Sequence, residues 1–362
     1  MFKLFKYRPL SDFLFKELYY QEIYFASYNE LNDPLDLSAR IEFTPESEDQ
    51  VDYLIYFLFK TSLKPLLNEN VSNSERDAIR SITLLKDDKE GREKFRRDLF
   101  SHISNLKKDH SFISFADIII LLQSFEKELN LKFNIKEFEK EIHRITDKFL
   151  ANSYTTCFSE KNDEFLMWSH YASKHSGICL EFSLDHFWLF PYILSRERKT
   201  IREEYLKRMS TWTAEGYIYW EKVLPVEYQE DQPFINFFDF SPVFENEHDC
   251  DLIGISKPVW HEYAHELLFA FTKKTNPWKY EKEWRAVSVS FGERKEPEER
   301  IHHYPIEALS GVYFGIRTPE DAKRRIIKML RKKKEIQFYE ARLTNGKEIE
   351  FIIKDDLEYD DY

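Results

Sequence analysis

Residues 153–182 read SYTTCFSEKNDEFLMWSHYASKHSGICLEF and contain three predicted elements in succession. Ser153–Ser159 is rich in β-branched and aromatic residues, which is typical of a strand. Glu164–His175 places its apolar side chains at helical spacing. Gly177–Phe182 is a second apolar strand, and Gly177 suits the left-handed position that ends a helix. The stretch therefore predicts a sheet with a helix packed against it.

Further elements of the same kind lie on both sides of this stretch. Phe2–Tyr7 predicts a strand, Ser11 or Asp12 can cap a helix that ends near Tyr20, and Ile23–Ser27 predicts another short strand. We therefore expect an α+β fold with a mixed or antiparallel central sheet, flanking helices and a helical insertion. The remaining strands are expected at Trp284–Phe291, Gly311–Gly315, Ile336–Leu343 and Glu348–Ile353, and the remaining helices at Pro319–Lys333, 196–215 and 257–275.

The insertion is expected at residues 50–149. Its apolar residues recur at helical spacing with many charged residues between them. We expect residues 1–49 and 150–362 to form one α+β domain, and residues 50–149 to be a helical insertion or cap. The helices of the insertion are predicted at Val51–Leu63, Glu90–Leu106, Ile113–Leu129 and Lys136–Phe149.

Composition excludes several classes of protein. The chain has 362 residues, of which 42% are hydrophobic, so it is too apolar to be disordered. Its formal charge of −12 argues against general binding to a nucleic-acid backbone, which needs a basic footprint. The basic segment 323–334 is either a local basic groove or, as is more usual for charge runs, the solvated face of a helix.

The cysteines and the N-terminus point to a reduced, cytoplasmic protein. Cys157, Cys179 and Cys250 have no paired spacing and no neighbouring histidines that would hold zinc, so no metal is expected. Charged residues interrupt the apolar stretch at the N-terminus, so no signal peptide is expected. The chain has no apolar run long enough for a membrane span.

The first candidate motif is Lys6-Tyr7-Arg8-Pro9 with the later turn Asn32-Asp33-Pro34-Leu35-Asp36. Arg8 ends the first strand, where its guanidinium can clamp a phosphate or carboxylate; the alternative is a surface salt bridge. We take Tyr7 and Arg8 as candidate ligand-binding residues. Asn32, Asp33 and Asp36 are either ligand-binding residues or side chains that bond the backbone of the turn.

The second candidate motif surrounds the helix of the opening stretch. Trp168, Tyr171 and His175 fall on one face of that helix, so they either belong to the core or line a pocket and stack on a flat ligand. Ser159 ends the preceding strand. Cys157 lacks an electropositive sequence setting, so we interpret it as a small buried residue.

The third candidate motif is Trp278-Lys279-Tyr280-Glu281-Lys282-Glu283-Trp284-Arg285. If it leads into a strand, Glu281 and Glu283 share the buried face of that strand by its two-residue period. A buried carboxylate is costly unless it is paired. The motif is therefore either a catalytic pair of carboxylates or a structural ion pair in which Arg285 or another cation neutralises them.

These motifs together resemble the bacterial domain-of-unknown-function family 2971. The resemblance rests on K-Y-R-P, N-D-P-x-D, C-F-S, L-M-W-S-H-Y-A-x-x-H-x-G, Y-E-x-E-W-R and G-V-x-F-G, in this order, and covers residues 1–40 and 150–345. The family has no settled activity, so the resemblance alone implies no function.

A second resemblance, to ADP-ribosyltransferases, implies an activity. Those enzymes place an Arg or His, a Ser or Tyr, and a Glu on successive strands, and this chain offers Arg8, Ser159 and Glu281-Lys282-Glu283. The resemblance implies NAD as the substrate, Glu283 on the ribose and braced by Ser159, and Glu281 activating the acceptor. It also implies a toxin or antiphage effector with a macromolecular acceptor or a neutralising partner protein. The S-T-S pattern of that family is not conserved around Ser159.

Two other classes remain open. The chain is alternatively a non-catalytic ligand- or partner-binding module. Removing Glu281 or Glu283 distinguishes the two: loss of a catalytic carboxylate abolishes activity and leaves folding intact, whereas loss of half of a buried ion pair destabilises the fold. A metal-dependent hydrolase that uses Asp33, Asp36 and the histidines is the least favoured class, because the i, i+5 spacing of His170 and His175 separates them on a helix.

Overall fold

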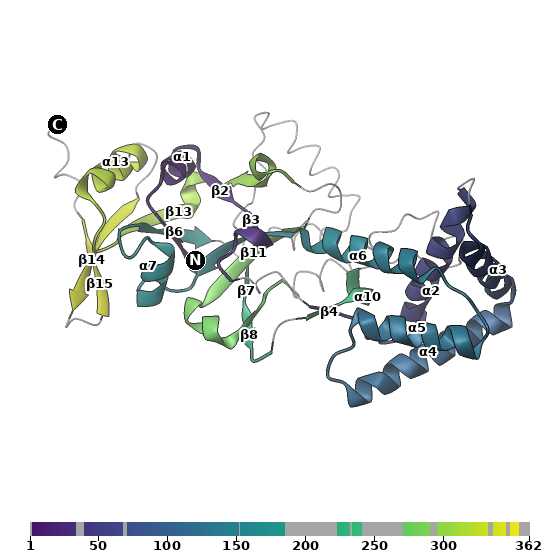
Figure 1. The fold of residues 1–362 in the computed structure, drawn as a ribbon. Helices are drawn as coiled ribbons and strands as arrows, with labels where there is room; N and C mark the ends of the chain where they lie inside the picture. The colour runs from purple at the N-terminus through teal and green to yellow at the C-terminus, as the bar shows by residue number, and fades with distance from the viewer. Residues whose placement is uncertain are drawn as a thin grey trace, which may run out of the picture.

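The fold is α+β, as expected, with a mixed and mostly antiparallel central sheet (Figure 1). A computed structural model describes the residues in ten ranges, and the statements below apply to them. The described ranges are 2–33, 40–67, 71–151, 153–184, 223–231, 234–240, 271–289, 295–331, 336–344 and 348–354. The predicted helix 196–215 and residues 257–270 lie outside these ranges.

The central sheet has the strand order β15-β14-β13-β6-β1-β5-β11-β7, and β3 also pairs with β5. Neighbouring strands are antiparallel, except that β13 and β14 are parallel. The outermost elements of the chain, β1 and β15, are therefore parts of one sheet. The strands are β1 (Phe2–Arg8), β3 (Ala26–Ser27), β5 (Ser153–Ser159), β6 (Ile178–Leu184), β7 (Val223–Pro225), β11 (Glu283–Val289), β13 (Leu309–Phe314), β14 (Gln337–Thr344) and β15 (Glu348–Ile353).

Each face of the sheet buries its own apolar cluster. On one face, α1 (Asp12–Tyr20) and α13 (Glu320–Leu330) cover a core that includes Leu4, Phe182 and Phe314. On the other face, Trp168 of α7 (Phe165–Tyr171) belongs to a cluster with Phe5, Tyr7 and Tyr313. Because β1 contributes Leu4 to one cluster and Phe5 to the other, its side chains alternate as the pleat requires. The strand is thus held from both sides.

The sheet opens between β1 and β5. β1 pairs with β6 along its whole length, from Phe2 opposite Leu184 to Arg8 opposite Ile178. With β5, in contrast, the two described strands share one register pair, Phe5 with Ser159. Since the strands diverge beyond this pair, backbone groups that a continuous ladder would satisfy face an opening instead. This opening becomes the candidate site.

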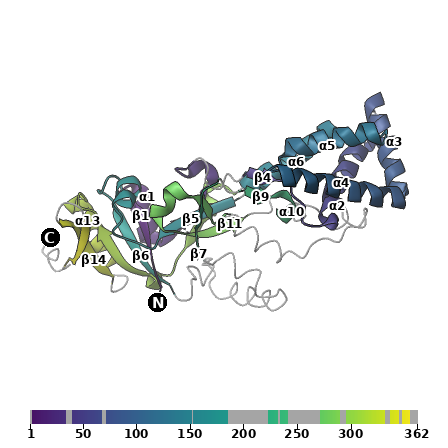
Figure 2. The same cartoon turned by 90° about the horizontal axis from the view of Figure 1, so that it is seen from below.

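The helices between β4 and β5 form a separate lobe at one end of the molecule (Figures 1 and 2). Ser72, Asp88 and Ser114 cap three of them with side-chain bonds to backbone N–H groups, which defines where those helices begin. Their apolar faces share a core with Phe43, Phe237 and Phe238. The helices are α2 (Glu48–Leu63), α3 (Asn73–Asp87), α4 (Lys89–Asp109), α5 (Phe115–Glu128) and α6 (Ile135–Ala151), followed by the short α10 (Phe237–Phe240).

Small two-stranded sheets and single 3₁₀ turns complete the described fold. β4 and β9 pair parallel at the base of the helical lobe, β8 and β10 pair parallel beside β11, and β2 and β12 pair antiparallel. The bounds are β2 (Glu22–Tyr24), β4 (Arg40–Glu42), β8 (Glu227–Gln229), β9 (Phe234–Asn236), β10 (Lys273–Thr275), β12 (Ile301–His303), η1 (Tyr28–Glu30), η2 (Lys64–Leu67), η5 (Asn276–Glu281), η6 (Pro297–Arg300) and η7 (Ile306–Ala308).

Several elements differ from the prediction, and the short strands β4, β7, β8, β9 and β12 were not predicted. The helix predicted to reach His175 ends at Tyr171, because Ser173, Lys174 and His175 adopt left-handed backbone angles. Gly177 does not take the left-handed position; it is needed because a Cβ there would lie 2.3 Å from the Arg8 carbonyl oxygen. The end of the predicted helix 257–275 is instead strand β10, and α3 was not predicted. None of the described helices is long and apolar enough to cross a bilayer.

Candidate functional site

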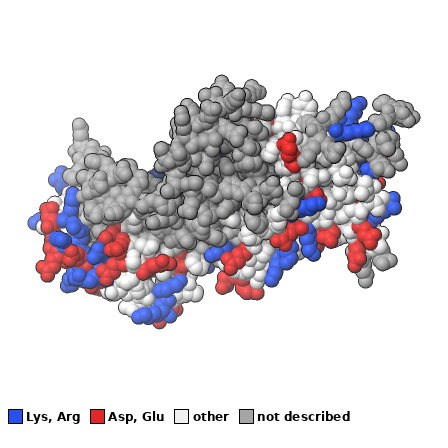
Figure 3. All heavy atoms as spheres, turned by 180° about the vertical axis from the view of Figure 1, so that it is seen from behind, with Lys and Arg blue, Asp and Glu red and all other residues white. Residues whose placement is uncertain are grey.

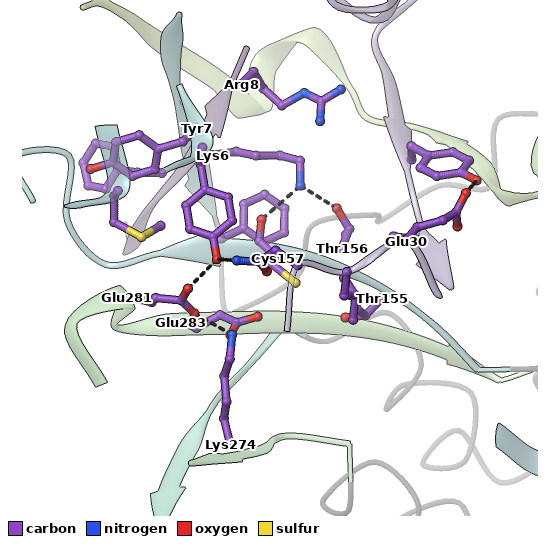
Figure 4. Close-up of a pocket in the computed structure, with 18 residues that line it drawn as sticks. Lys6, Tyr7, Arg8, Glu30, Thr155, Thr156, Cys157, Lys274, Glu281 and Glu283 are labelled. Carbon is purple, nitrogen blue, oxygen red and sulfur yellow. Dashed lines mark hydrogen bonds and ion pairs between the residues drawn. The ribbon is translucent and has the colours of Figure 1, made fainter. Parts of the chain in front are cut away.

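A cavity of about 300 Å³ lies in the opening of the sheet between β1 and β5 (Figure 4). Five separate parts of the chain meet there: β1, residues 24–32, β5, α7 and the β10–η5–β11 segment. Its walls combine aromatic rings with ionisable groups, as small-molecule sites do. The lining residues are Phe5, Lys6, Tyr7, Arg8, Tyr24, Ala26, Glu30, Leu31, Asn32, Thr155, Thr156, Cys157, Phe158, Met167, Tyr171, Lys274, Glu281 and Glu283.

The two predicted carboxylates reach this cavity by a turn and not by a continuous strand. Glu281 is the last residue of η5, Lys282 adopts a left-handed conformation (φ 45°), and Glu283 begins β11. The expectation that both carboxylates lie on one strand was therefore wrong, because Glu281 belongs to a 3₁₀ turn and Glu283 to the strand. Nevertheless both side chains are buried and both line the cavity, because the turn at Lys282 redirects the chain between them.

Glu281 is held by two neighbours that leave it able to titrate. Its carboxylate accepts a hydrogen bond from Tyr171 Oη at 2.5 Å and lies 2.7 Å from Lys274 Nζ. Burial raises the pKa of Glu281 to about 7; Lys274 lowers it, whereas the nearby charge of Glu283 raises it. Near neutral pH this carboxyl group therefore exists in both protonation states, as a general acid or base requires.

Glu283 is instead fixed as an anion. The Arg285 guanidinium donates to both of its oxygens at 2.7 and 2.9 Å, and Lys274 Nζ lies 3.2 Å away. Burial opposes ionisation, but Arg285 and Lys274 together hold the pKa of Glu283 well below its usual range. Arg285 has no exposed surface, so this is a buried bidentate pair. The structural ion pair that the sequence left open is thus present at Glu283.

The two cations of β1 that line the cavity differ in their partners. Arg8 lines the cavity but forms a bidentate ion pair with Glu17 of α1, at 2.5 to 3.0 Å. Lys6 donates to Thr156 Oγ1 at 2.8 Å and to the Cys157 carbonyl oxygen at 3.0 Å, both on β5. The Lys6 side chain therefore bridges the opening between the two strands (Figure 4).

Three of the predicted ligand-binding residues lie outside the cavity wall. Ser159 donates to the Glu281 carbonyl oxygen at 2.6 Å, so it braces the backbone of Glu281 and not the carboxylate of Glu283. Trp168 is fully buried and donates its indole N–H to the Asn162 carbonyl oxygen. The rings of His175 and Trp168 are stacked with their centroids 6.5 Å apart, and burial lowers the pKa of His175. Trp168 and His175 therefore belong to the core.

The other predicted residues are close to the cavity. Tyr7 and Tyr171 line it, and Tyr7 Oη donates to the Lys161 carbonyl oxygen at 2.8 Å. Asn32 lines it as well and donates to Tyr171 Oη at 2.8 Å, which connects the N-terminal turn to Glu281. Asp33 is buried but does not line the cavity. Asp36 lies outside the described residues.

Several lining residues were not predicted as site residues. Lys274 is 4% exposed and contacts both carboxylates, yet it lies in a segment that was predicted to be helical. Lys6 and Thr156 were quoted in motifs without a role, and Cys157 lines the cavity although we interpreted it as a small buried residue. The available signal for Lys6 and Thr156 was their place in strands that carry other candidate residues, Tyr7 and Arg8 on β1 and Ser159 on β5. Nothing in the sequence indicated Lys274, because its position depends on the pairing of β10 with β8.

The described residues include no metal cluster, and their charges are mixed on the face shown in Figure 3. The described His, Cys, Asp and Glu residues include no group of three or more that could hold a metal ion. On the face shown in Figure 3, the described Lys and Arg side chains are interspersed with Asp and Glu. In the basic segment, Lys323 forms ion pairs with Glu320 and Glu340. That lysine is therefore part of a mixed-charge cluster.

A family model described as "Protein of unknown function (DUF2971)" matches residues 167–286, about a third of the chain. The match includes Tyr171, Glu281, Glu283 and Arg285, but neither β1 nor β5. It supports the resemblance to that family over this segment, which is shorter than the range expected from the motifs. No curated protein and no solved structure matched the chain.

Proposed function

We propose that the cavity is the active site of an enzyme that breaks the bond between nicotinamide and ribose in NAD. The products are nicotinamide and an ADP-ribosyl group that passes to water or to a macromolecular acceptor. The observation that carries the proposal is Glu281, a buried carboxyl group with a pKa near 7 that faces a cavity beside Tyr171.

In this proposal Glu281, and not Glu283 as the resemblance implied, is the carboxylate that acts on the ribose. Cleavage of a glycosidic bond develops positive charge on the sugar, and a nearby carboxylate stabilises that charge. Glu281 is the better candidate because Arg285 and Lys274 already neutralise the charge of Glu283. Glu283 positions Lys274 and Arg285, and through Lys274 it affects the charge of Glu281.

The cavity also suits part of such a substrate. Its volume of about 300 Å³ is at the lower end for small-molecule sites, which suits one half of a dinucleotide. Tyr7, Tyr171 and Phe158 provide flat surfaces in its wall for a base or a nicotinamide ring.

The proposal is tested by incubating the protein with NAD, with and without cell lysate, and measuring released nicotinamide and labelled lysate components. The matched variant is Glu281→Gln, which keeps the shape of the side chain and removes its titration. We expect turnover by the wild type, with kcat/KM rising with pH through about 7, and a loss of about 10²-fold or more in the variant. Equal turnover by both proteins would contradict the proposal.

A non-catalytic binding module is the second candidate, and the ion pairs of Glu283 favour it. A carboxylate that two buried cations neutralise is typical of a structural pair. In that case NAD or a related nucleotide would raise the melting temperature without being consumed. Binding without turnover in the same incubation would favour this candidate.

A further inference from the structure

Among the described residues, Lys6 differs from the other cations of the cavity because no carboxylate pairs with it. Arg8 pairs with Glu17, and Lys274 pairs with Glu281 and Glu283. The acceptors of Lys6 Nζ are a hydroxyl and a carbonyl oxygen, and none of the described carboxylates lies within 4.0 Å of it. An ammonium group has three N–H donors, so one is left for a ligand.

The charges around the cavity add up to a positive site in an acidic protein. Among the described residues, Glu30 is balanced by Arg300 and Arg8 by Glu17. Lys274 and Arg285 face Glu283 and Glu281, of which Glu281 is partly protonated near neutral pH. Lys6 therefore leaves an excess of one positive charge, although the whole chain carries −12. A cavity with this balance favours an anionic ligand.

We propose that Lys6 and the Thr156 hydroxyl form an anion subsite that takes a phosphate or diphosphate group of the ligand. This inference rests on the proposed function, and it moves the phosphate-binding role that the sequence suggested for Arg8 to Lys6. Thr156 Oγ1 accepts from Lys6 at 2.8 Å, so its own hydroxyl hydrogen is free to point to an anion oxygen. Lysine binds phosphate in this way as a point charge.

The ionisation of Lys6 agrees with such a role. Burial and the neighbouring Arg8 lower the pKa of Lys6 to about 8, and Cys157, Glu17 and Glu283 offset part of this effect. A bound anion would favour the charged form and raise that pKa. Affinity for the anion is therefore present below pH 8 and decreases as the pH rises through about 8.

The test is a calorimetric titration with pyrophosphate, a probe that does not depend on turnover. We expect Lys6→Met to weaken binding about tenfold or more, since it removes a charge-assisted hydrogen bond. Lys6→Arg keeps the positive charge and should retain most of the affinity. Lys140→Met is the matched control, because Lys140 is an exposed lysine in the helical lobe. The affinity of this variant for pyrophosphate should stay within about twofold of that of the wild type.

A double variant separates Lys6 from Arg8. Arg8→Met with Glu17→Gln removes a cation together with its counter-ion, so it should weaken pyrophosphate binding much less than Lys6→Met does. Pyrophosphate binding that is unchanged in Lys6→Met, with the variant folded as judged by its melting curve, would overturn the subsite. So would a loss in the double variant equal to that in Lys6→Met.

The outcome is distinguishable from that of the proposed function. Glu281→Gln removes negative charge from the cavity wall, so it should bind pyrophosphate at least as tightly as the wild type does, whatever its activity. If pyrophosphate binding depends on Lys6 but NAD is not consumed, the subsite stands and the proposed activity fails. If NAD is consumed and neither turnover nor pyrophosphate binding depends on Lys6, the subsite fails alone.

Discussion

Tyr171, the last residue of α7, donates a hydrogen bond of 2.5 Å to the carboxylate of Glu281, which ends η5 110 residues later in the chain. The same hydroxyl accepts from Asn32 at 2.8 Å. Three segments that the sequence analysis treated as separate motifs therefore meet at one carboxyl group. Because Lys274 is the other partner of Glu281, the protonation state of Glu281 depends on a small and identifiable set of neighbours.

Removing the Tyr171 hydroxyl should raise the pKa of Glu281. The hydrogen bond from Tyr171 favours the ionised carboxylate and so lowers the pKa of Glu281, whereas burial raises that pKa. Tyr171→Phe removes the hydrogen bond and leaves the effect of burial. We expect the pKa of Glu281 to move above its value of about 7. Nuclear magnetic resonance titration of carboxyl-labelled glutamate would measure it. An unchanged or lower pKa in the variant would mean that the hydroxyl does not contact Glu281 in solution.

Replacing Glu281 by Gln should change how stability depends on pH. The pKa of Glu281 is raised from 4.5 to about 7 by folding, so the folded protein binds the proton more tightly than the unfolded chain does. This contribution to stability is fully present below about pH 4.5 and is lost as the pH rises through about 7, by about 1 kcal/mol per pH unit.

Urea denaturation of the wild type and Glu281→Gln at pH 5, 6, 7 and 8 measures this effect. The variant lacks the titrating group, so the free energy of unfolding of the wild type relative to the variant should fall by about 3 kcal/mol at most over this range. A difference that is constant with pH, or that grows as pH rises, would contradict the raised pKa of Glu281.

Removing Arg285 should destabilise the fold severely. Arg285 is fully buried and donates to both oxygens of Glu283, so Arg285→Met leaves a buried carboxylate with Lys274 as its described ion-pair partner. We expect a loss of about 3–5 kcal/mol in the free energy of unfolding. The double variant Arg285→Met/Glu283→Gln should recover a large part of it. Equal losses in the single and double variants would show that the pair is not coupled.

Gly177 should not tolerate a side chain. A Cβ at this position would lie 2.3 Å from the Arg8 carbonyl oxygen and 2.9 Å from the Ala172 Cα, and neither backbone atom can rotate away. Gly177→Ala should therefore cost about 1–3 kcal/mol of stability, measured by denaturation. Gly91→Ala is the control, because its closest contact is the flexible Asp88 side chain and alanine favours a helix. If Gly177→Ala loses no more unfolding free energy than Gly91→Ala does, relative to the wild type, that result contradicts the close packing of Gly177.

Much of the fold was predictable from local sequence patterns. The strand at residues 153–159 and the strand at 348–353 were predicted with the bounds that the structure has, because both are rich in β-branched and aromatic residues. Four helices of the lobe were predicted from their apolar spacing, whereas α3 was not. In α3 the buried residues fall at helical spacing, but two of the four are the small Ala78 and Ser81 and charged residues are numerous, so few strongly apolar side chains mark the helix.

The candidate site was predictable only in part. Glu281 and Glu283 were identified because a two-residue period places them on the buried face of a predicted strand, and Arg285 was identified as a possible counter-ion. The partners that decide their roles were not, because Lys274 and Tyr171 reach them through strand pairing and helix packing across the fold. The pairing of Arg8 with Glu17 is a nine-residue contact that no local pattern distinguishes from a free guanidinium. Sequence therefore indicated which segments matter but not which charges remain unpaired.

The most direct test of the account is a calorimetric titration of the wild type with NAD at pH 7, followed by measurement of free nicotinamide in the same sample. The account predicts saturable binding, release of nicotinamide, and loss of that release in Glu281→Gln with binding retained. If a folded wild-type protein shows no heat of binding and releases no nicotinamide, that result contradicts the assignment of this cavity to NAD.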